Sequence, residues 1–441
     1  MANKDELVFV CSNCGEEYLK WQGKCDNCGQ WNTLKEFKIQ KSKFKIRDSG
    51  NLTEPIELSK VTIKNHQRIS TKIGEFDRVL GGGIVPGSVV LLGGDPGIGK
   101  STLLLQVATK LESVLYISGE ESPEQIKLRF DRLGLSANRG SVSSGKTQSS
   151  KIYSEINLDN VISTIKRENP GLVIIDSIQT IYSGDFPSTP GSLVQVRECA
   201  LRLQQLAKTS GIPIFLIGHV TKEGSVAGPR ILEHLVDVVL YLEGERFHNN
   251  RILRAAKNRF GATDEIGIFE MTERGLIEVL NPSKLFLEER QKNVPGAIVT
   301  ATVEGTRSFL IEVQALTTTT VFGYPQRRSS GFDLNRLQLL VAVLQKRANL
   351  NLSNQDIFIN IVSGVKIKEP AVDLAVALAV TGAFKNKSFD PKLCVFGELG
   401  LSGEIRKVSF EKKRILEAKR LGFKKFIQEK TIGGLVRKYL V

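Results

Sequence analysis

The chain has 441 residues, of which 41% are hydrophobic and 24% are charged, a balance that suits a globular protein of two or three domains. It has no apolar run near the roughly 18 residues of a membrane span and no signal-peptide core at its start, so we expect a cytoplasmic protein with no membrane partner. The formal net charge of +14 favours a polyanionic partner such as nucleic acid, although a basic solvated surface would give the same total.

Residues 1–35 contain two Cys-x2-Cys pairs separated by ten residues. Four thiolates at this spacing suit one tetrahedral Zn²⁺, which would stabilise a segment too short to fold on a hydrophobic core. A redox or disulfide role is the alternative. The expected zinc ligands are Cys11, Cys14, Cys25 and Cys28. Residues 36–59 are rich in lysine and are expected to form a basic linker, either a plain spacer or a segment that touches nucleic acid.

Residues 60–280 alternate short apolar runs with helical patterns, which is typical of an α/β fold whose parallel sheet is covered on both faces. The expected strands are residues 89–92, 114–117, 172–175, 214–217 and 236–242. In such a sheet, ligands bind beyond the carboxyl ends of the strands. The residues that follow each strand are therefore the candidates for a functional site.

A glycine-rich loop follows the first expected strand and leads into a helical pattern, as in phosphate-binding loops. Its backbone N–H groups and the helix start would surround phosphate, Lys100 would reach the β- and γ-phosphates of ATP or GTP, and Ser101 would hold Mg²⁺. The residues expected to bind the nucleotide are Gly94, Asp95, Pro96, Gly97, Ile98, Gly99, Lys100, Ser101 and Thr102. Residues 140–147 repeat the motif without a preceding strand, which indicates a surface loop.

Acidic and basic side chains follow the other expected strands. Asp176 follows residues 172–175 and is expected to order the Mg²⁺ water shell. Glu120 is the favoured general base for the attacking water, with Glu121 as a substitute, and His219 is a candidate sensor of the γ-phosphate. A surface acid or a polar strand end is the alternative for Glu120 and His219.

These motifs resemble a known family. The LGGGIVPGS run at residues 80–88, ahead of the phosphate loop, resembles the RecA, KaiC and DnaB class of motor ATPases. The four cysteines, the SGEES and DSIQT runs that start at Ser118 and Asp176, and above all the KNRFG run at residues 257–261 narrow the resemblance to the bacterial DNA repair family RadA, also called Sms. It covers nearly the whole chain and is poorest at residues 138–150.

The resemblance implies roles for two basic segments. In RecA-like rings a neighbouring subunit supplies cations to the γ-phosphate, and the KNRFG run places Lys257 and Arg259 in or near that role, with binding of DNA phosphates or bracing of the loop as the alternative. Residues 184–197 and 221–230 match the DNA-facing loops of RecA by position. Lys222 and Arg230 in the second segment are candidate DNA contacts, and an ordinary surface loop is the alternative.

Residues 281–441 resemble the Lon-protease domain, an α+β fold like domain 2 of ribosomal protein S5. Ala371 stands where active Lon-type peptidases carry serine, so Lys412 would be a base without a nucleophile and peptidase activity is disfavoured. The domain is expected to support ring assembly and DNA contact instead, and a solvated basic face is the alternative. The basic candidates are Arg307, Arg327, Arg328 and Arg336.

The resemblance therefore implies a RecA-like P-loop ATPase core between a C4 zinc finger and a Lon-like domain that does not cleave peptides. The implied function is a DNA-dependent ATPase with ATP, Mg²⁺ and Zn²⁺ as cofactors. It would act as a homo-hexameric ring on single-stranded DNA, beside a RecA-type recombinase, and promote branch migration of branched recombination intermediates. The alternative is a KaiC-like regulatory ATPase that signals through protein contacts.

Overall fold

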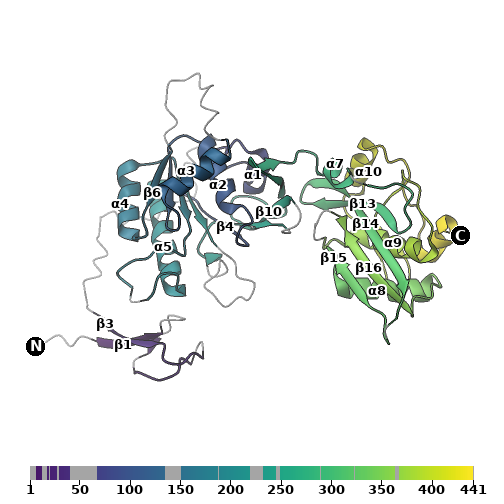
Figure 1. Ribbon diagram of the computed structural model, residues 1–441, viewed down its shortest axis with the longest axis horizontal. Helices are drawn as coiled ribbons and strands as arrows, with labels where there is room; N and C mark the ends of the chain where they lie inside the picture. The colour runs from purple at the N-terminus through teal and green to yellow at the C-terminus, as the bar shows by residue number, and fades with distance from the viewer. Residues whose placement is uncertain are drawn as a thin grey trace, which may run out of the picture. The chain divides into compact units, whose positions relative to one another are not determined.

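The structure is a computed structural model, drawn in Figure 1. It describes residues 6–11, 17–18, 20–26, 29–39, 67–134, 150–186, 188–218, 232–244, 249–288, 290–321, 323–362 and 367–440. The chain divides into two compact units. The first holds Met1–Glu243, Leu253–Thr263 and Met271–Ile277, and the second holds Gly244–Ile252, Asp264–Glu270 and Glu278–Val441. The domain boundaries expected from the sequence stay predictions.

The N-terminal segment forms a small antiparallel sheet of strand order β2-β1-β3. Its strands are β1 (Glu6–Cys11), β2 (Glu17–Tyr18) and β3 (Leu34–Ile39). Among the described residues, the buried core of this sheet consists of Cys11, Cys25 and Leu34.

The central sheet has nine strands in the order β12-β11-β10-β9-β4-β8-β7-β5-β6. Its strands are β4 (Val89–Gly94), β5 (Val114–Ser118), β6 (Lys151–Ser154), β7 (Leu172–Asp176), β8 (Ile214–Ile217), β9 (Val238–Glu243), β10 (Asn250–Asn258), β11 (Ile266–Thr272) and β12 (Gly275–Glu278). Strands β4 to β9 pair in parallel, so all five strands expected from the sequence are confirmed, and the last begins two residues later than expected.

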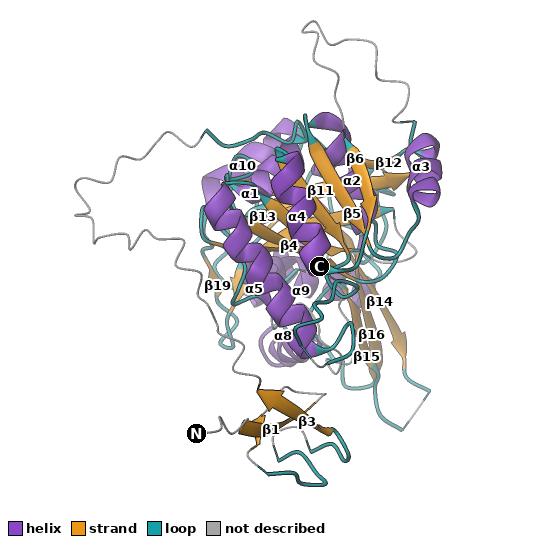
Figure 2. Ribbon diagram, turned by 90° about the vertical axis from the view of Figure 1, so that its left-hand side faces the viewer, coloured by secondary structure: helices purple, strands orange, loops and turns teal. Residues whose placement is uncertain are grey.

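Helices cover both faces of the parallel strands, as the apolar runs predict. These helices are α1 (Gly74–Leu80), α2 (Lys100–Lys110), α3 (Pro123–Arg132), α4 (Leu158–Glu168) and α5 (Leu193–Ser210). Helices α4 and α5 lie side by side over one face, where Val161 and Leu203 share a core with Leu91 (Figure 2). On the other face, Phe76 of α1 packs against Phe215 of β8, with ring centroids 5.9 Å apart.

The second unit is an α+β structure on a mixed five-stranded sheet of order β15-β16-β14-β13-β17. Its strands are β13 (Ala297–Glu304), β14 (Arg307–Thr319), β15 (Arg327–Ser330), β16 (Gln355–Ile361) and β17 (Cys394–Val395), and a hairpin pairs β18 (Glu398–Leu399) with β19 (Ile405–Arg406). The helices are α7 (Pro282–Leu287), α8 (Leu334–Arg347), α9 (Asp373–Lys385), α10 (Glu411–Arg420) and α11 (Ile432–Leu440).

The main core of the second unit lies between this sheet and helices α8 and α9. Val313 of β14 and Ile359 of β16 point to that core together with Leu344 of α8 and Leu378 of α9. Because side chains alternate along a β-strand, Gln314 lies on the opposite face of the sheet from Val313. Among the described helices of the whole chain, none is both long and apolar enough to cross a membrane.

Candidate nucleotide-binding site

The phosphate-binding loop lies where the sequence predicts it, between β4 and α2. Helix α2 begins at Lys100 directly after Gly99, so its first N–H groups and its positive dipole end face the loop. Gly99 has φ +111°, and a Cβ at this position would lie 2.5 Å from the methyl carbon of Met271. The left-handed backbone conformation at the helix start therefore favours glycine, whereas the flexible Met271 side chain could move aside.

The Lys100 side chain is buried and turns back onto this loop. It is 3% exposed, and its Nζ donates to the carbonyl of Gly94 at 2.8 Å and of Asp95 at 3.0 Å. Burial lowers the pKa of Lys100 to about 8, while Asp176, Asp95 and Glu120 act in the opposite direction. A buried ammonium surrounded by loop amides is suited to anionic phosphates, which would replace the carbonyls as its partners.

The predicted Mg²⁺ residue Asp176 lies at the carboxyl end of β7. This strand pairs with β5, where Ser118 and Asp176 are partners in the register. Asp176 is 7% exposed, and its Oδ2 accepts a 2.5 Å hydrogen bond from the Tyr116 hydroxyl. Burial, together with the Asp176 charge, raises the pKa of Tyr116 well above its usual range, so the tyrosine stays a proton donor that orients the carboxylate.

The structure separates the roles of the two adjacent glutamates. The Ser177 hydroxyl donates to Glu120 Oε1 at 2.6 Å, which holds this carboxylate beside the end of β7. Glu121 is paired instead with Arg129 of α3. The Glu120 carboxylate is thus held beside the end of β7 while Glu121 is held by α3, and this contrast supports the prediction that Glu120 is the general base.

These groups fit a Mg²⁺-bound nucleotide. The buried Lys100 ammonium and the α2 N-terminus are donors for phosphate oxygens, and Ser101 and Asp176 supply the oxygen ligands that Mg²⁺ prefers. Bound Mg²⁺ would neutralise charge on the phosphates and order the water molecules around them. The chain's own contribution is a pre-arranged set of donors at the carboxyl ends of the strands.

Lys257 and Arg259 lie near the amino end of β4, at the end of the strand opposite to the phosphate loop. Arg259 Nη1 lies 3.3 Å from Asp237 Oδ1, and Asp237 Oδ2 accepts from the backbone N–H of Val89 at 3.0 Å. Val89 opens β4 and Gly94 ends it, so about 16 Å of strand separates this edge from the phosphate loop. The two cations therefore cannot reach phosphates bound by their own chain.

The rest of the KNRFG run is fixed to the segment that follows α1. The Asn258 side chain donates to the carbonyl of Leu80 at 3.3 Å and accepts from the Phe260 backbone N–H at 2.9 Å. The Arg68 guanidinium donates to the carbonyl of Phe260 at 2.5 Å and of Leu80 at 3.0 Å. These contacts hold the loop that carries Lys257 and Arg259 against the LGGG turn.

Sequence reasoning missed four side chains that arrange this site. Three are polar residues inside or directly after the expected apolar strands and could have been flagged as such: a tyrosine within residues 114–117, a serine directly after Asp176, and an acid within residues 236–242. The fourth, an arginine far away in sequence, gave no signal. These residues are Tyr116, Ser177, Asp237 and Arg68.

Several predicted site residues lie outside the described residues. They are His219, Lys222 and Arg230, together with Cys14 and Cys28 and the second motif at residues 140–147. The described half of the zinc site fits its role: Cys11 and Cys25 are fully buried in one small core. Cys25 opens a tight turn in which the Gly29 N–H donates to the Cys25 carbonyl at 2.8 Å. Buried thiols on such a turn are the donors that structural zinc requires.

The basic candidates of the second unit differ in their surroundings. Arg327 donates to the carbonyls of Gln326 and Leu352 at 3.0 and 3.1 Å. Arg307 donates to the Leu280 carbonyl at 2.5 Å, while Arg328 is exposed. Their DNA contacts stay predictions.

Arg336 forms a bidentate ion pair with the fully buried Asp373, so the first role of Arg336 is to neutralise that acid.

Of the first predicted DNA-facing segment, residues 184–197, the part from Leu193 onward is helical.

The segment around Ala371 in the Lon-like unit contains an ion pair. Ala371 is buried and Lys412 is exposed on α10. The buried cation is Arg414, which pairs with Glu369 two residues before Ala371 and donates to the carbonyl of Ala301 at 2.6 Å. Arg414 is 0% exposed and Glu369 is 22% exposed, so the guanidinium of this pair is fully buried.

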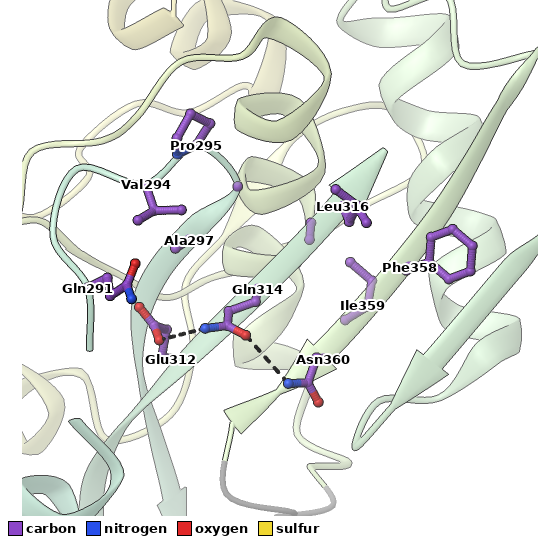
Figure 3. Close-up of a pocket in the computed structure, with 12 residues that line it drawn as sticks. Gln291, Val294, Pro295, Ala297, Glu312, Gln314, Leu316, Phe358, Ile359 and Asn360 are labelled. Atoms are coloured by element: carbon purple, nitrogen blue, oxygen red, sulfur yellow. Dashed lines mark hydrogen bonds between the residues drawn. The ribbon is translucent and has the colours of Figure 1, made fainter. Parts of the chain in front are cut away.

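A separate pocket of about 470 Å³ lies on the outer face of the second unit's sheet (Figure 3). Gln314 donates to Glu312 at 3.0 Å and Asn360 points to Gln314 at 3.5 Å. Burial raises the pKa of Glu312, whose Oε1 lies 3.5 Å from Arg290 Nε.

The fold and the site define a class of protein: a P-loop ATPase with a RecA-like core, an N-terminal zinc ribbon and a Lon-like C-terminal domain. Family comparisons agree. Residues 54–225 match a model described as an AAA domain, residues 9–36 match a rubredoxin metal-binding domain, and residues 332–431 match subunit ChlI of Mg-chelatase. ATP with Mg²⁺ and Zn²⁺ are accordingly its cofactors.

The chain belongs to the RadA family of DNA repair proteins. It is 51% identical to DNA repair protein RadA of Bacillus subtilis over 433 residues, which cover 96% of this chain and 92% of that protein. It is 50% identical to DNA repair protein RadA of Listeria monocytogenes over 437 residues, which cover 98% of this chain and 93% of that protein.

Solved structures similar to the chain match about half of it. A KaiC-like protein of Pyrococcus horikoshii is 23% identical with a TM-score of 0.40, covering 48% of this chain and 99% of that one. The RadB recombinase is 24% identical with a TM-score of 0.38, covering 48% of this chain and 99% of that one.

Proposed function

We propose that the chain is a DNA-dependent ATPase of recombinational repair that works as a ring on single-stranded DNA and promotes branch migration. One observation carries the proposal: Lys257 and Arg259 lie about 16 Å of strand away from their own phosphate loop. Cations so placed can act on ATP only when a second subunit presents its phosphate loop to them. The family's role in DNA repair and the net charge of +14 support DNA as the track.

In this proposal each site is assembled from two subunits. One subunit supplies Lys100, Ser101 and Asp176 for the Mg²⁺-nucleotide and Glu120 as base, and the next supplies Lys257 and Arg259. Cations delivered across an interface to the transferring phosphoryl group accelerate hydrolysis by about 10³–10⁵. His219 would sense the γ-phosphate, and Lys222, Arg230, Arg307 and Arg328 would contact DNA phosphates. The expected partner is a RecA-type recombinase, and the expected assembly is a homo-hexameric ring.

Subunit mixing tests the shared site directly. Lys100→Ala destroys the phosphate loop but leaves Lys257 available, and Lys257→Ala does the reverse. In a random 1:1 mixture about a quarter of the interfaces join an intact loop to an intact Lys257, so we expect about a quarter of the natural rate from two inactive proteins. A mixture no more active than its two components would contradict the shared site.

DNA dependence is tested on the unaltered chain. We expect single-stranded DNA to stimulate ATP hydrolysis and its binding to weaken steeply as salt rises, because phosphate contacts release counterions. Hydrolysis that is slow and indifferent to DNA would instead support the KaiC-like regulatory alternative.

A further inference from the structure

A tyrosine on β9 is packed against the strand that leads into the phosphate loop. Tyr241 is the partner of Gly93 in the parallel pairing of β9 with β4. A Cβ at position 93 would lie 2.6 Å from Cε1 of Tyr241, so the aromatic ring rests directly on the Gly93 backbone. A shift of the Gly93 backbone would therefore displace the Tyr241 ring.

The hydroxyl of the same tyrosine reaches the turn that holds Lys257. Tyr241 donates a 2.8 Å hydrogen bond to Glu233 Oε1. The Lys257 Nζ donates to the backbone carbonyl of Glu233 at 2.7 Å and of Val236 at 2.9 Å. One short turn, residues 232–236, thus accepts a hydrogen bond from Tyr241 through the Glu233 side chain and hydrogen bonds from Lys257 through its backbone carbonyls. Contacts run without a break from Gly93 to the Lys257 ammonium.

Glu233 also acts on Lys257 through charge. Burial is the main cause that lowers the pKa of Lys257, and the neighbouring Arg259 lowers it further, whereas Asp237 and Glu233 raise it. The Glu233 carboxylate therefore favours the protonated ammonium. A cation that serves a phosphoryl group has to be protonated, so this carboxylate supports the same role as the hydrogen bond.

We propose that Tyr241 and Glu233 are positioning residues that fix Lys257 relative to the phosphate loop of the same chain. A shift of Gly93 when the loop closes on nucleotide would pass through the Tyr241 ring to the turn and change how Lys257 is offered to the next subunit. The effect on hydrolysis rests on the proposed function, whereas the effect on the Lys257 ammonium does not.

The first experiment measures the ammonium itself in the full-length protein. Acetic anhydride acylates amines at a rate that mass spectrometry can follow at Lys257, and carbonyl partners slow it. Tyr241→Phe keeps the ring on Gly93 and removes only the hydroxyl, and we expect Lys257 to react about fivefold faster. Tyr153→Phe is the matched control, because it removes a 3.3 Å tyrosine-to-Glu155 hydrogen bond on β6 and should leave this rate unchanged. An unchanged rate in Tyr241→Phe would overturn the proposal.

The second experiment asks whether Tyr241 acts through Lys257. We expect Tyr241→Phe to lower kcat for ATP on single-stranded DNA by about 3- to 10-fold with little change in KM, and to have no further effect when Lys257 is already methionine. The same fall in both backgrounds would mean that Tyr241 acts independently of Lys257, which contradicts the proposal. If Lys257→Met itself leaves kcat unchanged, the shared site fails and the acylation rate still decides the positioning role.

A third variant isolates the charge. Glu233→Gln keeps an oxygen for the Tyr241 hydroxyl but loses the carboxylate that raises the pKa of Lys257. The alkaline fall of kcat should therefore begin at a lower pH than in the natural chain, with Asp237 and Arg259 left in place. An alkaline limb that does not move would remove Glu233 from the proposal.

Discussion

Replacing Glu120 by glutamine tests the assignment of the general base. Glutamine has nearly the same shape and keeps an oxygen for the Ser177 hydroxyl, which lies 2.6 Å from Glu120 Oε1. The substitution therefore removes a proton acceptor and one negative charge while the surrounding hydrogen bond can persist. Glu121→Gln is the matched control one residue away, since Glu121 is paired with Arg129.

The size of the effect follows from what each carboxylate does. Loss of a general base lowers kcat by about 10²–10⁴, which corresponds to about 3–5 kcal/mol in the barrier. Nucleotide affinity should stay within about threefold or rise slightly, because a negative charge near the phosphates has been removed. In Glu121→Gln the lost ion pair is partly exposed, at 31% for Glu121 and 20% for Arg129, and is worth at most about 1 kcal/mol of stability.

Steady-state hydrolysis at saturating single-stranded DNA gives kcat and KM, and a fluorescent nucleotide gives the affinity of each variant. We expect Glu120→Gln to bind ATP and fail to turn it over, and Glu121→Gln to hydrolyse ATP within about threefold of the natural rate. The reasoning is refuted if the two variants exchange these properties, or if Glu120→Gln retains more than about a tenth of kcat.

Three further predictions concern other parts of the chain. The pKa of Lys100 is lowered to about 8 in the folded chain, and phosphates bind its protonated form. The Kd for ATP should therefore be constant below pH 8 and rise above it by up to about tenfold per pH unit. A titration with fluorescent nucleotide measures this Kd, and the pH dependence should be lost in Lys100→Arg. Asp237→Ala leaves the buried Val89 N–H without its acceptor and should lower the free energy of unfolding by about 1–3 kcal/mol in urea melts followed by circular dichroism, whereas Asp237→Asn should cost less. Cys25→Ser should release zinc, measured as bound metal per chain, while the equally buried Cys199→Ser should keep it.

Five of the nine strands of the central sheet and the phosphate loop could be predicted from the sequence, because apolar runs and glycine-rich motifs are local patterns. Five apolar runs gave five parallel strands, and a glycine-rich motif after a strand fixed the start of α2 at Lys100. The sequence favours Glu120 over Glu121 as the base, but it does not show the contacts that distinguish the two side chains. Those contacts are with Ser177, which is 57 residues away from Glu120 in sequence, and with Arg129 in α3.

The basic candidates show a second limit of sequence reasoning. Arginine counts predict a cationic surface, but they do not tell which guanidinium groups are already used inside the protein. Arg336 neutralises the buried Asp373, and Arg327 donates to backbone carbonyls. Arg328, one residue along β15, is exposed. Neighbouring residues on a strand point to opposite faces, so of this adjacent pair Arg327 is half-buried and bonded to backbone carbonyls while Arg328 is exposed.

The position of Lys257 also constrains how subunits can associate under the proposed function. The phosphate loop lies at the carboxyl end of β4, and the Asp237 carboxylate ties Arg259 to its amino end. A subunit that receives ATP at one end and donates cations from the other must join two different surfaces. Such an interface is heterologous and cannot form a closed two-fold dimer; it generates a ring or an open filament. Light scattering of the ATP-bound chain should therefore show assemblies beyond a dimer, and a stable dimer with full activity would be incompatible with a site completed by Lys257 of a neighbour.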